Sequence, residues 1–244
     1  TEQPSKPFPP SARRATTRGM SRATPITEYE KYLRVPELLA LQKPAAELSC
    51  HDELQFQVIH QSAELWMKLI DHELALAAQL MAQDELARAT VTLRRVNMIQ
   101  HLLTESLKVM DTMAPRNYMR IREVLGRGSG QESPGFKRML QIPGELWPTV
   151  EALLTRRAIT LRQIHEAPEA HGELFALCEA LIDYDQDLQW WRRRHILMVY
   201  RIIGVGTPSL KGNHSELLEK GAREQFFPAL WQVRDEVFGE WPRA

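Results

Sequence analysis

The sequence predicts an all-α fold, a helical bundle preceded by a disordered N-terminal tail. Apolar residues recur every three or four positions in five long segments, which is the spacing of one buried helix face. No stretch of four to eight residues shows sustained alternation of apolar and polar side chains between turn residues, so β-strands are not indicated. With 244 residues, of which 43% are hydrophobic, the chain can form one sizeable core, and we expect a single domain over residues 26–244.

Residues 1–25 differ in composition from the rest of the chain. They contain five Lys or Arg, one Glu and five Pro, with many Ser and Thr. Such a segment cannot bury enough apolar surface to offset the entropy lost on ordering, so we expect a disordered basic tail. Its arginine content is loosely similar to that of an organelle presequence, and a flexible bacterial extension is the alternative.

Other bulk features indicate a cytoplasmic protein. No run of 18 or more apolar residues occurs, so we expect no membrane span. Cys50 and Cys178 form no CxxC motif, which argues against a disulfide scaffold and a Cys-rich zinc site. The formal net charge of zero argues against nucleic-acid binding.

The first half of the bundle is expected to contain two long helices and one short helix. Leu54, Val58 and Trp66 belong to the apolar stripe of a helix at about residues 51–83. A second helix at about residues 85–113 ends before Pro115, because proline lacks an amide hydrogen and its ring clashes with the preceding turn. A short helix follows at about 116–125.

The second half begins with a glycine-rich loop. Gly126, Gly128 and Gly130 allow the backbone there to approach a ligand closely. We expect further helices at about residues 145–165, 172–203 and 214–238. Gly204 is a plausible cap for the second of these, since glycine readily adopts the left-handed conformation that ends a helix.

Tyr118 and Arg122 are the most informative pair in the chain. They are four residues apart on the short helix, so their side chains are neighbours. A guanidinium presents a planar fork of donors that matches a carboxylate, and a phenol adds a third donor. The pair therefore suits an amino acid or another small carboxylic acid; an exposed Arg paired with a nearby Glu is the alternative.

Two histidines lie in apolar surroundings at helical spacing. His195 shares one helix face with Trp191 and Val199, and His60 follows Phe56 by one turn. A buried imidazole needs a partner. Each histidine is therefore either a core residue bonded to a backbone carbonyl or part of a metal or haem site.

Competing sites have less support. No histidine has a Glu three positions before it and no H-E-x-x-H occurs, so the motifs of di-iron bundles and zinc proteases are missing. The glycines at 126–130 and 204–206 match neither G-x-G-x-x-G nor a P-loop. The run Arg192–Arg194, next to two tryptophans, could bind nucleic acid, haem propionates or solvent.

Taken together, these residues resemble the tryptophan 2,3-dioxygenase family of the haem-dependent aromatic oxygenase superfamily. The stretch His51–Trp66, HDELQFQVIHQSAELW, is similar to the family's HDE…F…HQ…ELW helix almost position for position. Further matches, in the family's order, are Tyr29 and Tyr32, Tyr118 and Arg122, Ser129-Gly130, the W-R-x-R-H segment ending at His195, and Gly206-Thr207. The resemblance covers nearly all of residues 28–235.

The resemblance implies a role for each residue around the cofactor. His195 would be the axial ligand of the iron of a non-covalent haem b, with Trp191 beside it. His60 would lie on the distal side near the indole N–H, with Phe56 packing on the ring.

The resemblance also implies how an amino-acid substrate is held. Arg122 and Tyr118 would bind the carboxylate, Ser129 would border the substrate, and Thr207 would bind the ammonium group. Tyr29 and Tyr32 would reach into the site of a neighbouring subunit, which implies a homotetramer with exchange of the N-terminal segment.

The implied reaction is dioxygenation of tryptophan by O2 to N-formylkynurenine, with cleavage of the indole C2–C3 bond. A haem monooxygenase that converts tryptophan or β-methyltryptophan to a 2-oxindole, as in the maremycin-pathway branch of secondary metabolism, is one alternative. A haem-binding sensor without turnover is another, and a helical interaction module without a cofactor is a third.

The chain departs from the family at the edge of the expected site. Where the family has S-S-G-F-Q-S, residues 128–133 read GSGQES, so Gln131 replaces an aromatic and Glu132 replaces an amide. An aromatic residue usual near Leu107 is absent, and the loop after Thr207 reads PSLKG. The region from about 140 to 170 is shorter than the family's helical insertion. These changes leave the implied iron ligand and carboxylate clamp in place while altering their surroundings.

Overall fold

The computed structural model describes residues 25–126, 128–205, 219 and 221–239. Helices dominate these residues and none of them is in a β-strand, which confirms the all-α prediction. The expected disordered tail lies outside the described residues, apart from Pro25. The chain divides into two compact units, Thr1–Leu41 and Gln42–Ala244. A single domain over residues 26–244 stays a prediction.

Within the first unit, two short helices follow one another directly. Helix α1 (Glu28–Leu33) begins with a capping box, in which the Thr27 hydroxyl accepts from the Glu30 amide at 3.1 Å and the Glu30 carboxylate accepts from the Thr27 amide at 2.7 Å. Helix α2 (Val35–Leu39) starts after Arg34, whose left-handed φ of 53° separates the two helices. Neither helix contains a buried residue.

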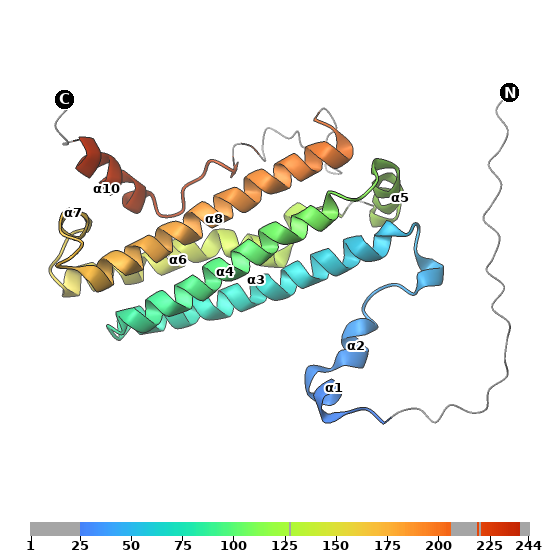
Figure 1. Ribbon diagram of the computed structural model, residues 1–244, viewed down its shortest axis with the longest axis horizontal. Helices are drawn as coiled ribbons and strands as arrows, with labels where there is room; N and C mark the ends of the chain where they lie inside the picture. Colours follow the sequence, from blue (N-terminus) through green and yellow to red (C-terminus); the bar gives the residue numbers. More distant parts are fainter. Residues whose placement is uncertain (1–24, 127, 206–218, 220, 240–244) are drawn as a thin grey trace. The chain divides into compact units, whose positions relative to one another are not determined.

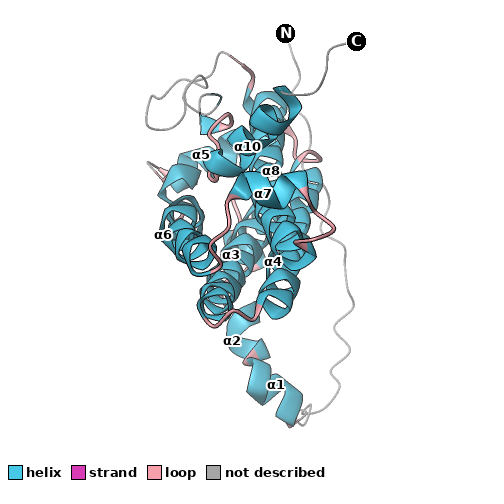
Figure 2. Ribbon diagram, turned by 90° about the vertical axis from the view of Figure 1, so that its left-hand side faces the viewer, coloured by secondary structure: helices cyan, strands magenta, loops and turns pink. Residues whose placement is uncertain are grey.

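The second unit is built from four long helices that lie side by side among the described residues (Figure 1). They are α3 (Asp52–Ala82), α4 (Leu86–Met110), α6 (Pro134–Arg156) and α8 (Gly172–Ile203). Helix α4 packs against both α3 and α8, and α3 also packs against α6. Figure 2 shows this bundle from its end. The core between the helices consists mainly of Leu, Ile, Met and Ala side chains, so apolar burial holds the bundle together.

Shorter elements lie at the two ends of the bundle. Helix α5 (Pro115–Leu125) lies at one end, and α7 (Leu161–Glu166) and α10 (Pro228–Gly239) lie at the other (Figure 1). The 3-10 turns η1 (Ala45–Glu47) and η2 (Gly130–Glu132) precede α3 and α6. Asp52, at the start of α3, accepts from the Asn117 amide group at 2.8 Å, and the Cys50 thiol donates to the Asn117 carbonyl at 3.5 Å. These bonds hold α5 against the start of α3.

A buried carboxylate on α8 fixes the segment before α10. Asp185 is fully buried and accepts from the amides of Phe226 at 2.8 Å and Phe227 at 3.0 Å. It also accepts from the indole of Trp231 and the side-chain amide of Gln189, both at 2.8 Å. A carboxylate without water needs such donors, so these bonds fix the position of residues 226–231 on α8.

A second acidic side chain of α8 faces α4. The Asp187 carboxylate lies 3.2 Å from His101 Nε2. Burial raises the pKa of Asp187 to about 6, the nearby His101 opposes this rise, and Asp183 adds to it. Burial is thus the dominant effect on this carboxylate.

Four of the expected helices match the structure closely, and the helix expected at about 145–165 is wrong. Helix α6 begins earlier, at Pro134, because Ser133 caps it and proline suits the first helical turn. It ends at Arg156, and Ala158, with a φ of 48°, separates it from α7. A continuous helix at 214–238 is also wrong, because residues 222–227 are turn and loop and α10 starts at Pro228; residues 214–218 and 220 lie outside the described residues.

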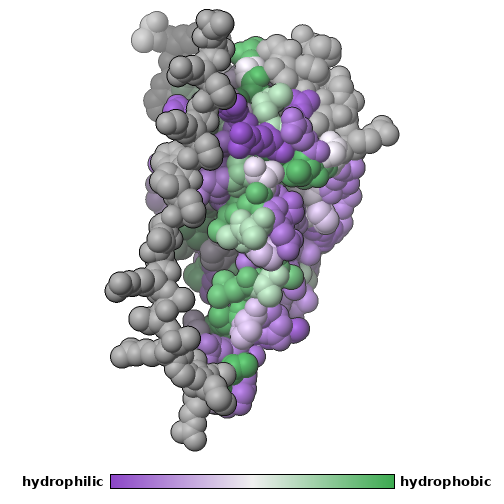
Figure 3. Space-filling view, turned by 90° about the vertical axis from the view of Figure 1, so that its right-hand side faces the viewer, coloured by the Kyte–Doolittle hydropathy of each residue, from purple (hydrophilic) through white to green (hydrophobic). Residues whose placement is uncertain are grey.

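Hydrophobic residues are exposed among hydrophilic ones on the face of the molecule in Figure 3. Four large exposed residues of α4 fall at spacings of seven, four and seven, which places them on one side of the helix: Val91, Met98, Leu102 and Val109. Among the residues that the structure describes, none of the helices combines the length and the hydrophobicity of a membrane span.

Candidate active site

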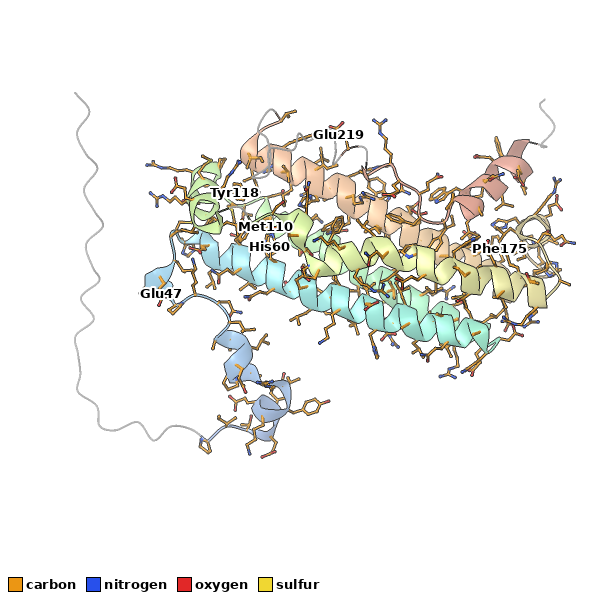
Figure 4. All side chains as sticks on the ribbon, turned by 180° about the vertical axis from the view of Figure 1, so that it is seen from behind. Glu47, His60, Met110, Tyr118, Phe175 and Glu219 are labelled. Carbon is orange, nitrogen blue, oxygen red and sulfur yellow. The ribbon has the colours of Figure 1, made fainter. Side chains whose placement is uncertain are left out.

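A cavity of about 460 Å³ lies at the α5 end of the bundle. Side chains from α3, α4, α5, α6 and α8 and from the loop around η2 line it. Figure 4 shows His60, Met110 and Tyr118 close together at this end, with Phe175 at the opposite end. The volume is within the range of sites for small molecules and cofactors.

Most of the residues singled out in the sequence border this cavity. The residues on its wall are Phe56, His60, Tyr118, Arg122, Ser129, Trp191 and His195. Tyr29 and Tyr32 belong to α1 in the other compact unit, where they are 70% and 88% exposed. Thr207 lies outside the described residues. The tertiary structure therefore brings together side chains that are up to 139 positions apart in the sequence, from Phe56 to His195.

His60 and Phe56 form one wall of the cavity, one helical turn apart on α3. Their ring centroids are 4.0 Å apart, and His60 Nδ1 lies 2.7 Å from the Phe56 carbonyl oxygen. A carbonyl can only accept, so Nδ1 carries the proton and Nε2 keeps its lone pair. His60 borders the cavity. The surrounding protein shields the ring from bulk water, which lowers its pKa, and the Phe56 carbonyl and the negative charge of Glu64 oppose this shift. His60 is therefore neutral at neutral pH.

His195 is the second imidazole on the cavity wall. Burial, with a smaller contribution from the charge of His60, lowers its pKa to about 4. Neither ring nitrogen has a hydrogen-bond partner among the described residues. The Trp191 ring, one turn earlier on α8, stacks on the imidazole at 5.4 Å with an angle of 19° between the planes. His195 thus offers a neutral imidazole whose lone pair is not used by the protein.

Tyr118 and Arg122 reach the cavity from α5. Burial raises the pKa of the Tyr118 phenol, and the positive charge of Arg122 opposes the rise. The phenol therefore stays a hydrogen-bond donor at neutral pH. Its ring centroid is 6.4 Å from that of Phe56, so the aromatic wall of α3 continues onto α5. The Arg122 guanidinium and the Tyr118 phenol thus lie beside an otherwise apolar surface.

The loop after α5 closes this side of the cavity. Gly126 ends α5 with a φ of 63°, a conformation that favours glycine. Ser129 and Glu132 then form a capping box around η2, in which the Ser129 amide donates to the Glu132 carboxylate at 3.0 Å. Ser129 and Gln131 both line the cavity. The side-chain amide of Gln131 therefore lies at the edge of the site.

The arginine run before His195 makes contacts within the protein. Arg192 lies 3.3 Å from the Glu224 carboxylate and over the ring of Phe226, 5.7 Å from its centroid. Arg194 pairs with Asp111. Arg192 also borders the cavity, so it faces both a protein carboxylate and the site.

The sequence analysis missed two charged residues of the cavity wall. Lys137, on α6, could not be assigned because the helix expected at 145–165 starts beyond it. Glu64, on α3, stands in the helix motif without a predicted role, although its position four residues after His60 places it on the same helix face. Both lie close to the loop that contains Ser129 and Gln131.

The cavity combines a mostly apolar wall with a small number of polar side chains. Its wall is mostly apolar, with an area of aliphatic residues from α4 and α8 that includes Leu107, Met110, Met198 and Ile202. Two neutral imidazoles face it, and a guanidinium and a phenol lie together on α5. Such a cavity can hold flat apolar groups and can bind one carboxylate.

The chain is similar to one family of known proteins. The model of the family described as "Tryptophan 2,3-dioxygenase" matches residues 13–146. A tryptophan 2,3-dioxygenase of Caulobacter vibrioides is 32% identical, over 86% of this chain and 98% of that protein. Proteins of the same name from Saccharopolyspora erythraea and Myxococcus xanthus are 31% and 30% identical, over 86% and 89% of this chain and 92% of each relative.

Proposed function

Because the chain belongs to the tryptophan 2,3-dioxygenase family of haem-dependent oxygenases, we propose that it uses O2 to oxidise the indole ring of L-tryptophan or a close analogue. One observation carries the proposal. A single cavity combines a neutral histidine that has no hydrogen-bond partner among the described residues with a guanidinium and phenol pair. The first suits an iron ligand, and the second suits the carboxylate of an amino acid.

The residues around His195 fit a haem b. A neutral imidazole is the form that binds iron, and the low pKa of about 4 keeps His195 in that form. Trp191 stacks flat on the ring and restricts its orientation. Lys137 and Arg192 border the same cavity and supply positive charge for the two propionates. When bound, the haem would supply an iron with one open position for O2.

His60 and Phe56 are proposed to orient the indole. The Nε2 lone pair of His60 can accept a hydrogen bond from the indole N–H, because Nδ1 is already bonded to the Phe56 carbonyl. The Phe56 ring offers a flat apolar surface beside it. His60 would thus polarise the N–H without having to remove the proton.

The amino-acid end is proposed to bind at α5 and the neighbouring loops. Arg122 and Tyr118 would hold the carboxylate, with Ser129 at the edge of the bound molecule. Thr207 is proposed for the ammonium group by resemblance alone. A carboxylate held at one end and an indole N–H held at the other would leave the substrate one orientation, and such positioning accelerates a reaction.

We further propose a homotetramer in which Tyr29 and Tyr32 of one subunit reach the site of another. Their exposure of 70% and 88% supports this, since an exposed tyrosine ring leaves apolar surface uncovered. Light scattering after size-exclusion chromatography measures the assembly. A monomer at micromolar concentration would contradict this part of the proposal.

Ring cleavage to N-formylkynurenine is the proposed reaction, because the relatives are named tryptophan 2,3-dioxygenases and insertion of both oxygen atoms at the indole C2–C3 bond gives this product. One observation favours a second candidate, oxidation of tryptophan or β-methyltryptophan to a 2-oxindole. Gln131 lines the cavity where the family usually has an aromatic residue, so the surroundings of the substrate are altered. A monooxygenase also needs a reductant for the second oxygen atom.

Mass spectrometry of the product made under labelled O2 distinguishes these reactions. L-tryptophan and β-methyltryptophan are each supplied with and without ascorbate. Two labelled atoms in the product indicate ring cleavage, and one indicates monooxygenation. No labelled product, with the haem present, would contradict both reactions and leave a haem-binding sensor.

The ligand role of His195 is tested separately by the Soret absorption band. His195→Ala is expected to lose the band, while His165→Ala is expected to keep it. His165 is a suitable control because it is a half-buried histidine on α7, at the other end of the bundle, bonded to the Leu161 carbonyl at 2.8 Å. A full Soret band in His195→Ala would refute the assignment.

A further inference from the structure

The start of α6 is held by a carboxylate from another helix. Glu64 of α3 accepts from the Ser133 hydroxyl through one oxygen, and from the Gly135 amide through the other at 3.0 Å. Ser133 is the N-cap of α6, and its hydroxyl in turn accepts from the Phe136 amide at 3.0 Å. The free amides of the first helical turn are thus satisfied by Ser133 and by Glu64 together.

The same residues continue directly into the loop that lines the cavity. The Ser133 amide donates to the Gly130 carbonyl at 3.1 Å, which ends η2. The capping box of Ser129 holds the other end of η2. A short series of hydrogen bonds therefore connects Glu64 to Ser129 and Gln131, both on the cavity wall.

The contact between α6 and α3 leaves no room for a side chain at position 135. A Cβ atom at Gly135 would lie 2.8 Å from the Glu64 carboxylate and 2.9 Å from the Met67 Cβ. Only a glycine allows the backbone of α6 to approach α3 this closely. Glu64 itself also borders the cavity, four residues after His60.

We propose that Glu64 is a positioning residue of the substrate site, which holds residues Ser129–Ser133 against the cavity through its two hydrogen bonds to the start of α6. This inference rests on the proposed function, because it assigns the loop to the bound amino acid. A carboxylate that only stabilised α6 could be supplied within the helix or its cap. Glu64 instead comes from the helix that also carries Phe56 and His60, so it fixes the distance between the two sides of the site.

The test compares Glu64→Ala, Glu64→Gln and Ser133→Ala in the haem-loaded full chain. Glu64→Ala is expected to raise KM for L-tryptophan on the order of 10-fold, the effect of losing both hydrogen bonds to the start of α6, with a smaller change in kcat. Ser133→Ala loses one of the bonds and is expected to raise KM about 3-fold. Haem content and helical circular dichroism are expected to match those of the unmodified chain.

Glu64→Gln is the conservative variant, which keeps both hydrogen bonds to the start of α6 and removes the negative charge. A glutamine oxygen can accept from the Gly135 amide, and its amide group can donate to the Ser133 oxygen, so KM is expected to stay within about 3-fold of the original value. Glu145→Ala is the matched control. Glu145 is an exposed glutamate on α6 that pairs with Arg138 at 2.6 Å, and its loss is expected to leave KM unchanged.

Several outcomes would overturn the inference. The first is an unchanged KM in Glu64→Ala. The second is a Glu64→Gln variant with a KM as high as that of Glu64→Ala, because the charge of Glu64 and not its hydrogen bonds would then determine KM. If Glu64→Ala does not fold, Ser133→Ala decides, and an unchanged KM in that variant would exclude the role. If instead the unmodified chain shows no Soret change with L-tryptophan, the proposed function itself fails.

Discussion

Replacement of Arg122 by Leu tests the most specific part of the proposed site. Arg122 is half-buried on the cavity wall, and Leu keeps part of its apolar stem while removing the charge. A hydrogen bond to a charged group contributes about 1.5–3 kcal/mol. We therefore expect Arg122→Leu to bind L-tryptophan about 10- to 150-fold more weakly, since each 1.4 kcal/mol is a factor of ten. The haem lies against other residues in the proposal, so haem content is expected to stay the same.

Two variants on the same helix complete this experiment. Tyr118→Phe removes a neutral donor, which contributes about 0.5–1.5 kcal/mol, so binding is expected to weaken about 2- to 12-fold. Arg120→Leu removes an exposed arginine that does not border the cavity, and it is expected to have no effect. Haem content is measured first, and L-tryptophan is then titrated while the Soret band is recorded. An Arg122→Leu variant with the affinity of Arg120→Leu would refute the carboxylate clamp.

Three further variants test the packing of the bundle. Asp185→Ala leaves buried donors without an acceptor and is expected to cost about 3–5 kcal/mol of unfolding free energy in urea, whereas the exposed Asp183→Ala should cost little. Gly135→Ala places a Cβ atom 2.8 Å from a carboxylate oxygen and is expected to destabilise by about 1–3 kcal/mol; Gly144→Ala, in the same helix with open space, should stabilise by about 0.5–1 kcal/mol. Burial raises the pKa of Asp187 in the folded state to about 6 from its ordinary value of 3.8, so its stabilising contribution is complete below about 3.8 and is lost as the pH rises through about 6. Asp187→Asn should therefore gain stability relative to the original chain as the pH rises from about 4 to about 6, and a pH-independent difference would contradict this reasoning.

Local signals in the sequence predicted most of the bundle. The helix expected at 172–203 has the bounds of α8, because a long apolar periodicity meets Gly204, which ends the helix with a φ of 84°. Pro115 likewise separates α4 from α5. Where the signal was ambiguous, the prediction failed. Pro143 and Pro148 lie inside α6, where proline usually ends a helix, and the true start at Pro134 depends on a cap completed by α3.

The sequence likewise predicted one part of the candidate site and not the other. Spacing alone paired Phe56 with His60 and Tyr118 with Arg122, since residues four apart share a helix face. Spacing could not show that both pairs border one cavity with His195, which depends on how α3, α5 and α8 pack. Their roles at the cofactor and the substrate stay predictions.

The sequence by itself therefore determined most of the helices, because capping and periodicity act within a few residues, and it determined the family, because several short motifs occur in one order. Only the tertiary structure decided which side chains meet. The bond from Glu64 to Gly135 and the bond from Asp185 to Phe226 each join residues more than 35 positions apart, and the pKa of His195 falls to about 4 because the surrounding helices remove the ring from water. Such contacts depend on the packing of whole helices, and no local pattern in the chain encodes them.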